Sequence, residues 1–253
     1  VVLSGRKNAD YGQFPAVKDY GTNGLVLGTY TFEEDTNQYL HAMYSIINEK
    51  GLAMGESTCS RDRNDKNANV LKDLFAAADG MYDCYMLQDL ALECCDTARE
   101  AVEFMGAILD EFGWSGTAEC INICDGDEAW IFEAYGGNYW VAIRVPDDMF
   151  FVAANRCRVD VFYENDPANY LYHKGIKEDA LKYGLWDGTG EFQPCKAYAP
   201  NDNFAKNSGC ILREWRALSL LCSDLELDPY SDPDTWPLWV VPDEKVSVDT
   251  IHK

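Results

Sequence analysis

The chain has 253 residues, of which 47% are hydrophobic, so it is long enough and apolar enough to form one folded domain with a sizeable core. Its 43 acidic and 21 basic residues give a formal net charge of −22, which repels the phosphates of nucleic acids and of anionic lipids. No apolar run approaches the roughly 18 residues that cross a bilayer. We therefore expect a single domain over residues 1–253 with neither a nucleic acid partner nor a membrane span.

The first quarter of the chain contains three predicted strands. Residues 24–32 are rich in Val, Leu, Tyr and Thr, which favour strands. Residues 39–47 follow an acidic turn, and residues 51–58 follow the turn formed by residues 48–51. Because the second and third segments are joined by so short a turn, we expect them to pair antiparallel.

Three helices are predicted next. Residues 69–78 and 85–94 have helical composition, and Asp96 is placed to cap a helix that ends at Gly113. Apolar residues at alternating four- and three-residue spacing give this helix one apolar stripe, which we assign to the core: Ala98, Val102, Met105, Leu109 and Phe112.

Residues 128–159 predict three short strands with tight turns. The apolar run at residues 130–132 leads into a hairpin-type turn at residues 136–138, and aromatic and β-branched residues resume at residues 139–145. A second turn at residues 146–148 precedes the apolar run at residues 150–152. We expect these strands to form a meander, which ends at the polar pair Asn155-Arg156.

The last third of the chain mixes helix with irregular structure. Residues 174–190 predict a short helix with a Gly-rich exit, residues 193–209 a polar loop, residues 211–222 a helix, and residues 228–242 an extended stretch rich in proline. Strand-rich and helix-rich blocks follow one another without strict alternation, which indicates an α+β protein.

Ten cysteines are more than a cytosolic hydrolase usually carries, and no CxxC pair supports a structural zinc site. Disulfides in a secreted or lysosome-like compartment explain the number, with buried free thiols as the alternative. The absence of an Asn-x-Ser/Thr acceptor weakens the secretory interpretation. The acidic run Asp125, Asp127 and Glu128 supplies too few oxygens for calcium, and we expect neither a metal nor another cofactor.

Several ordered motifs resemble one known family. Within residues 128–156 these are E-A-W-x-x-E, Gly-Gly-Asn-Tyr-Trp-Val-Ala, Arg-Val-Pro-Asp-Asp and Val-Ala-Ala-Asn-Arg. Three further stretches agree in the same order: NEKGLAMGESTCS at residues 48–60, DTAREAVEFMGAILDEFGW at residues 96–114 and REWRALSLL at residues 213–221. Together they resemble the cysteine-nucleophile dipeptidases related to the secernins, which are N-terminal-nucleophile hydrolases.

The resemblance implies a four-layer α-β-β-α sandwich with largely antiparallel sheets. It also implies a mature chain that opens with a cysteine, whose thiol attacks the amide while its own α-amino group acts as the base. This chain opens with Val1-Val2-Leu3, and the family pattern continues beyond Lys253. We therefore expect residues 1–253 to be an incomplete domain that lacks the N-terminal cysteine and the C-terminal part.

Asn155 and Arg156 are the leading catalytic candidates. A side-chain amide at a strand end can donate a hydrogen bond to the oxyanion of an amide hydrolase, although an Asn in this place also suits a simple turn. The guanidinium of Arg156 can orient the nucleophile or bind a substrate carboxylate, and the alternative is a surface ion pair.

Glu56, Ser57 and Asn138 are the candidates for substrate binding. Glu56 and Ser57 lie in a segment that in the family resembles part of the cleft wall, where a carboxylate can bind the free amino group of a dipeptide. The alternative for Glu56 and Ser57 is that they are polar only because they lie at the edge of a sheet. Asn138 follows the Gly136-Gly137 turn and has a structural interpretation beside the functional one. Cys59 and Cys157 lie beside family motifs, but no spacing links either of them to a histidine.

The resemblance favours a dipeptidase-like amidohydrolase that cleaves small peptides with a cysteine nucleophile outside this chain. The alternative is an inactive relative that serves as a structural or binding component. The expected partner is a small peptide substrate, and the sequence leaves room for a homo-oligomer or a larger assembly.

Overall fold

A computed structural model of the chain describes residues 35–59, 65–76, 80, 82–200 and 204–252, with residues 204–207 described by their backbone alone. It also describes the backbone of three short strands nearer the N-terminus, at residues 2–4, 13–17 and 26–31. No helix among these residues is both long and apolar enough to cross a membrane.

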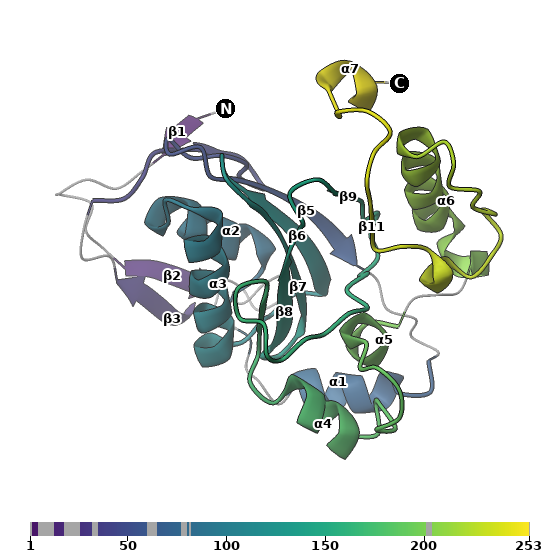
Figure 1. The fold of residues 1–253 in the computed structure, drawn as a ribbon. Helices are drawn as coiled ribbons and strands as arrows, with labels where there is room; N and C mark the ends of the chain where they lie inside the picture. The colour runs from purple at the N-terminus through teal and green to yellow at the C-terminus, as the bar shows by residue number, and fades with distance from the viewer. Residues whose placement is uncertain are drawn as a thin grey trace.

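One antiparallel sheet of five strands organises the structure, in the order β10-β8-β7-β6-β5 (Figure 1). The strands are β5 (Ala53–Cys59), β6 (Ala118–Cys124), β7 (Ala129–Gly136), β8 (Tyr139–Arg144) and β10 (Tyr170–Tyr172). Each pair of neighbours in this order runs antiparallel. Strand β6 lies between β7 and the edge strand β5 and was not predicted from the sequence.

Three two-stranded antiparallel sheets accompany the large sheet. Strand β1 (Val2–Ser4) pairs with β4 (Tyr39–His41), and β2 (Gln13–Val17) pairs with β3 (Val26–Thr31). Strand β9 (Phe150–Phe151) pairs with β11 (Trp239–Val240). The third strand of the predicted meander corresponds to β9, and its predicted place in the meander is wrong. Strand β9 lies outside the large sheet, where β10 pairs with β8 instead.

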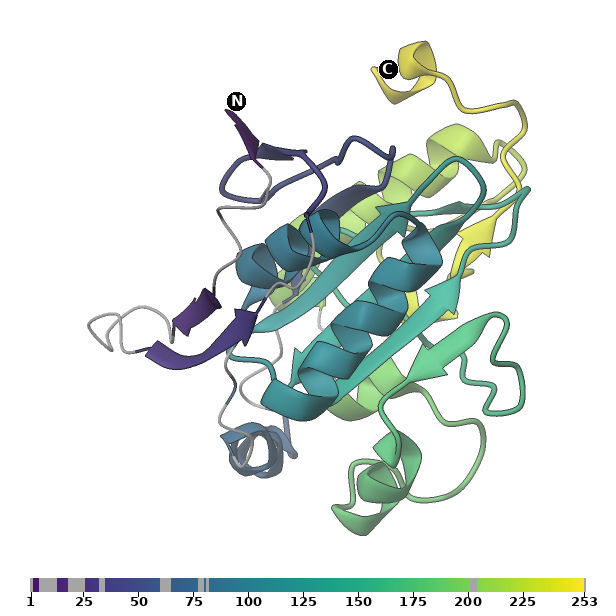
Figure 2. The ribbon, with the colours of Figure 1, turned by 90° about the vertical axis from the view of Figure 1, so that its left-hand side faces the viewer.

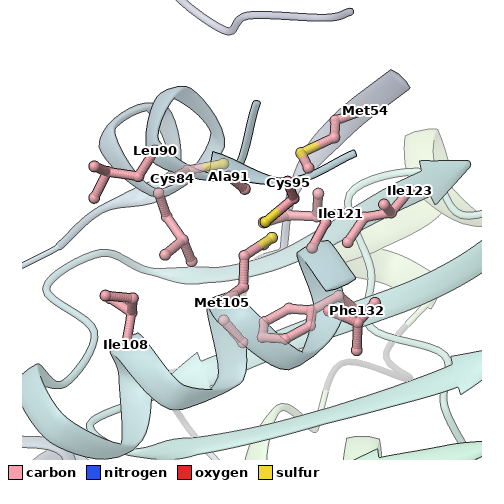
Figure 3. Packing of buried hydrophobic residues seen from close by; sticks show 14 of the residues in the cluster. Met54, Cys84, Leu90, Ala91, Cys95, Met105, Ile108, Ile121, Ile123 and Phe132 are labelled. Carbon is pink, nitrogen blue, oxygen red and sulfur yellow. The ribbon is translucent and has the colours of Figure 1, made fainter. Parts of the chain in front are cut away.

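Helices α2 (Cys84–Cys94) and α3 (Ala98–Phe112) cover one face of the large sheet (Figures 1 and 2). The apolar stripe of α3 is buried as predicted, and Phe112 packs against the same core. Facing it from the sheet are Ile121, Ile123 and Phe132 (Figure 3). The cap of α3 is Thr97, which forms a capping box with Glu100, and not Asp96 as predicted.

The opposite face of the sheet packs against the segment that follows β9 and against helices α4 (Ile176–Lys182) and α5 (Pro194–Tyr198). Because side chains alternate along a strand, Cys59, Cys120 and Ile131 point to this face while their neighbours point to α2 and α3. The remaining helices are α1 (Ala68–Ala76), α6 (Phe204–Leu221), α7 (Val248–Ile251) and a 3-10 turn at Pro233–Thr235.

The predicted α+β class with antiparallel sheets is confirmed, and helices on both sides of the large sheet are consistent with the sandwich that the resemblance implies. The pairing expected between residues 39–47 and 51–58 is reduced to an isolated bridge between Ile47 and Ala53, since β4 pairs with β1 and β5 pairs along its length with β6. The loop predicted at residues 193–209 contains α5 and the start of α6.

All ten cysteines lie in the described part of the chain, and all are free thiols. The disulfides predicted from their number are therefore absent from the structure. The physical reason is their distribution, since most of the cysteines are separate members of packed strands and helices within the core. The argument for a secreted or lysosome-like compartment loses the support that it drew from disulfides.

Candidate active site

Asn155 lies in the segment that leaves β9 and crosses the end of β5. It has a φ of 58°, and it is the only residue other than glycine with a positive φ among those described. This left-handed conformation costs most L-residues about 1–2 kcal/mol, while Asn tolerates it better than most. The unusual backbone turns the Asn155 side chain back toward β5.

The side-chain amide of Asn155 is held from both sides. Its Nδ2 donates to the carbonyl oxygen of Thr58 at 2.7 Å, and its Oδ1 accepts from Nη2 of Arg213 on α6 at 2.9 Å. A flip of the amide would break both bonds, so the two partners fix which atom is nitrogen. An amide nitrogen carries two hydrogens, and the second N–H of Asn155 has no partner among the described residues. Asn155 therefore presents a rigid donor that is only half-buried.

Arg156, the next residue, points into the protein. Its side chain is 4% exposed, and Nε and Nη2 donate to Oε2 of Glu214 at 3.2 and 2.7 Å. Nη1 donates to Asp234 at 2.9 Å. Burial acts to lower the pKa of Arg156, but the charge and hydrogen bonds of Glu214 together with the charge of Asp234 outweigh it, and the pKa ends above its ordinary value. The surface ion pair considered from the sequence is in fact buried.

A substrate carboxylate finds no vacant nitrogen on Arg156, because the two acidic partners occupy Nε and both terminal nitrogens. The predicted contact with substrate therefore gains no support from the geometry. The contact with Glu214 instead fixes the backbone beside Asn155, since the other oxygen of Glu214 accepts from the N–H of Ala154 at 3.2 Å. Arg156 is a positioning residue in this arrangement.

Arg158 completes the buried charge cluster on Glu214. Its Nε lies 3.6 Å from Glu214 Oε2, and its two terminal nitrogens donate to the carbonyl oxygens of Val152 and Pro237. Burial lowers the pKa of Arg158, and the charge of Glu214 opposes this. Together Arg156, Arg158 and Glu214 tie the segment at residues 152–158 to α6.

Glu133 on β7 holds the other end of the same segment. It is fully buried and accepts from the backbone N–H groups of Arg158 at 2.6 Å and Val159 at 3.2 Å, and from the hydroxyl of Tyr135 at 2.9 Å. Burial raises the pKa of Glu133 to about 7, although these hydrogen bonds act to lower it.

Glu56 and Ser57 are adjacent on β5, so they point to opposite faces of the sheet. Ser57 faces the side of Cys59 and Cys157, and its hydroxyl oxygen is buried without a hydrogen-bond partner among the described residues. Glu56 faces α2, where its carboxylate lies near Cys84. Only Ser57 is therefore directed to the same side of the sheet as the segment that carries Asn155.

Asn138 sits in the turn between β7 and β8 and supports a helix end. Its Nδ2 donates to the carbonyl oxygens of Leu109 and Asp110 in the last turn of α3, at 2.6 and 3.0 Å. The Leu109 carbonyl also accepts from the N–H of Gly113, the C-cap residue, so Asn138 adds a second donor there and supplies one to Asp110 at the helix end. This position favours the structural interpretation, and a contact with substrate stays a prediction without geometric support.

The internal thiols are poorly suited to act as nucleophiles. Cys59 and Cys157 are buried and hydrogen-bonded to each other, and burial raises the pKa of both thiols. No hydrogen bond joins a histidine to a cysteine within the described residues; His41 and His173 instead contact Asp89 and Asp110.

Sequence reasoning missed the residues that hold Asn155 in place, although the motifs contained them. Arg213 and Glu214 begin the REWRALSLL stretch, and Glu133 ends E-A-W-x-x-E. The available signal was a charged residue embedded in an apolar strand or helix face, which indicates a paired or hydrogen-bonded side chain.

An antiparallel α+β scaffold that holds a rigid amide donor at the end of a strand suits the hydrolysis of an acyl bond. The profile of peptidase family C69 matches residues 29–253, and the chain belongs to that family. This finding confirms the predicted resemblance at the level of the family.

Similar proteins carry corresponding names. The chain is 26% identical to a probable dipeptidase of Salmonella dublin over 241 residues, which are 94% of this chain and 50% of that protein. It is 35% identical to a probable dipeptidase of Latilactobacillus sakei over 52% of this chain and 27% of that protein. It is 29% identical to probable dipeptidase A of Streptococcus pyogenes serotype M1 over 75% of this chain and 39% of that protein. The chain thus spans half of these relatives' length or less.

Proposed function

We propose that the protein containing this chain is a dipeptidase that cleaves the peptide bond of small peptides. The family and the names of its relatives support this activity. The observation that carries the proposal for this chain is Asn155, whose left-handed backbone and two hydrogen bonds fix the side-chain amide and leave one N–H without a partner among the described residues.

In the proposed reaction, an N-terminal cysteine outside residues 1–253 attacks the carbonyl carbon of the peptide. Its α-amino group accepts the thiol proton. The carbonyl oxygen becomes an oxyanion, which accepts a hydrogen bond from the free N–H of Asn155. The tetrahedral intermediate collapses to a thioester as the leaving amine takes up the proton. Water then hydrolyses the thioester and restores the thiol.

The first experiment replaces Asn155 in the full-length protein and measures kcat for dipeptide hydrolysis. We choose Asn155→Gly, because glycine adopts a φ of 58° without strain while it removes the amide. Loss of one oxyanion donor is expected to reduce kcat by about 10²–10³. The matched control is Asn169→Ala, since the Asn169 amide bonds only within its own turn, to Asp166. A kcat for Asn155→Gly equal to that of the control would remove Asn155 from the mechanism.

The second experiment locates the nucleophile. Native protein is sequenced from its N-terminus and treated with iodoacetamide at low stoichiometry, and the alkylated peptide is mapped. The proposal expects the label on an N-terminal cysteine, with activity lost in proportion to labelling. Activity lost in proportion to alkylation of an internal cysteine would assign the chemistry to that residue instead. A native chain without any cysteine at its terminus and without dipeptidase activity would support the inactive relative.

A further inference from the structure

A second group of reactive side chains lies on the helix-covered face of the sheet, away from the segment that carries Asn155. Glu56 on β5, Glu119 on β6 and Cys84 at the start of α2 each place one ligand atom within 4.8 Å of the others. Strand register brings the two carboxylates together, because Glu119 pairs with Thr58, two residues from Glu56 on the same face of β5. Cys84 is the first residue of α2, and it reaches the two carboxylates from the helix layer (Figure 3).

The group is unbalanced in charge. Cys84 and Glu119 are each 5% exposed, and none of the ion pairs among the described residues includes Glu56 or Glu119. One oxygen of Glu119, Oε2, is buried and accepts no hydrogen bond from any described residue. A buried carboxylate oxygen without a donor or a cation is costly, and native proteins rarely leave one so.

A fourth polar side chain, outside the group, contacts Cys84. Gln88 lies one turn after Cys84 on α2 and is fully buried. Its Oε1 accepts from the Cys84 thiol at 3.6 Å, while its Nε2 has no partner among the described residues. If Cys84 becomes a thiolate, the Gln88 amide can rotate to donate N–H to the sulfur. A cation bound by the Cys84 thiolate and Glu119 would therefore give a partner both to Oε2 of Glu119 and, through the sulfur, to Nε2 of Gln88.

We propose that Glu56, Cys84 and Glu119 form a binding site for one thiophilic divalent transition-metal ion, of which Zn²⁺ is the best match. Two carboxylate oxygens and one thiolate suit Zn²⁺, which binds sulfur and oxygen ligands in tetrahedral geometry, and a water molecule completes the four. Ca²⁺ and Mg²⁺ do not match, because these hard cations take oxygen ligands and Cys84 offers sulfur. The site ties β5, β6 and α2 together, and Gln88 orients the sulfur as an outer-shell partner.

Binding exchanges protons for the metal ion. Thiolate and carboxylate ligands bind a metal ion in their deprotonated forms, so the proton of the Cys84 thiol leaves as M²⁺ binds. The N-terminus of α2 repels a cation, but it stabilises the thiolate, and the neighbouring Asp83 adds negative charge. The affinity for the metal is expected to rise with pH.

Cobalt substitution tests the site independently of peptidase activity. The full-length protein is treated with a chelator, dialysed and titrated with Co²⁺, and the thiolate-to-cobalt charge-transfer absorption is recorded; Zn²⁺ is then added in competition. We expect one Co²⁺ per chain, displacement by Zn²⁺, and affinity that is at least about tenfold higher at pH 8 than at pH 6. Absence of a charge-transfer band at pH 8 would overturn the proposal.

Variants assign the ligands. Cys84→Ser should abolish the charge-transfer band, and the matched control Cys222→Ser should keep it, because Cys222 is a half-exposed thiol that follows α6 and donates to the Val241 carbonyl. Glu119→Gln and Gln88→Ala should each weaken Zn²⁺ binding by about 10–100-fold. Zn²⁺ should raise the melting temperature of the wild type and of Cys222→Ser but not of Cys84→Ser. A band that survives Cys84→Ser would place the metal elsewhere.

Discussion

Glu214 gives the sharpest test of how the Asn155 segment is held, because it is a fully buried carboxylate between two buried arginines. Replacement of Glu214 by Gln keeps the size and shape of the side chain but removes its charge. Arg156 then retains Asp234, whereas Arg158 retains only the backbone carbonyls of Val152 and Pro237. Two guanidinium groups that are 4% and 3% exposed lose their common counter-charge.

The expected loss follows from the partners that remain. Removing one member of a buried ion pair costs about 3–5 kcal/mol, because the remaining charge stays desolvated. Asp234 compensates part of this for Arg156, and the amide of Gln still accepts one hydrogen bond, so we expect Glu214→Gln to cost about 3 kcal/mol. With a urea m-value of about 3 kcal/mol/M, the unfolding midpoint should fall by about 1 M.

The assay is equilibrium urea unfolding followed by tryptophan fluorescence, with the m-value compared between variants. The matched control is Glu103→Gln, which breaks an exposed pair with Arg99 whose side chains are 54% and 37% exposed. Such a pair contributes about 0.5 kcal/mol or less, so the control should unfold close to the wild type. If both variants shift the midpoint equally, Glu214 does not balance two buried charges and the reasoning fails.

Two further predictions concern other parts of the core. Gly106→Ala on α3 should destabilise the protein by about 1–3 kcal/mol in urea unfolding, because a Cβ there would lie 2.3 Å from the Trp140 ring. Gly209→Ala on α6 meets nothing within 4 Å and should be neutral or stabilising; equal effects of the two would contradict the packing of α3 on β8. Glu133→Gln should change how stability depends on pH, because the folded pKa of Glu133 is about 7 and the unfolded pKa of Glu is about 4.3. A carboxyl group whose pKa is raised by folding contributes stability below pH 4 that is lost as the pH rises to 7. The stability of the wild type relative to Glu133→Gln should therefore fall by up to about 3 kcal/mol over that range, and two parallel pH profiles would refute the raised pKa.

Local patterns predicted the elements of this fold better than their pairing. The stripe on α3 and its end at Gly113 follow from helical periodicity, and the β7–β8 hairpin follows from its glycine turn. Pairing of β9 with β11 depends on residues 239–240, which lie far along the chain and which no local pattern connects to residues 150–151. Strand β6 was missed because its face toward α2 and α3 includes the charged Glu119, which breaks a simple apolar run.

The same contrast between local pattern and tertiary contact holds for the residues of the candidate site. Asn155 was found because it follows an apolar run within a family motif, yet its left-handed backbone and its contact with Thr58 are tertiary facts. Arg156 was predicted to orient the nucleophile or bind a substrate carboxylate, with a surface ion pair as the alternative, and only the fold reveals that it is buried against Glu214, 58 residues further along. The sequence left two roles open for Asn138, because a polar residue after a turn can hydrogen-bond a helix end as readily as it binds a ligand.

The two faces of β5 explain how one strand can serve two kinds of chemistry. A shift of register by one residue would move Glu56 to the face of Asn155 and Ser57 to the face of Cys84, so the pairing with β6 keeps the carboxylates away from the proposed oxyanion site. Such separation matters, because a negative charge close to a developing oxyanion would oppose its formation. Thr58 contacts both groups: its carbonyl accepts from Asn155, and its hydroxyl donates to Glu56 at 3.5 Å. A metal ion bound at Glu56 would therefore stiffen the strand end on which the position of Asn155 depends.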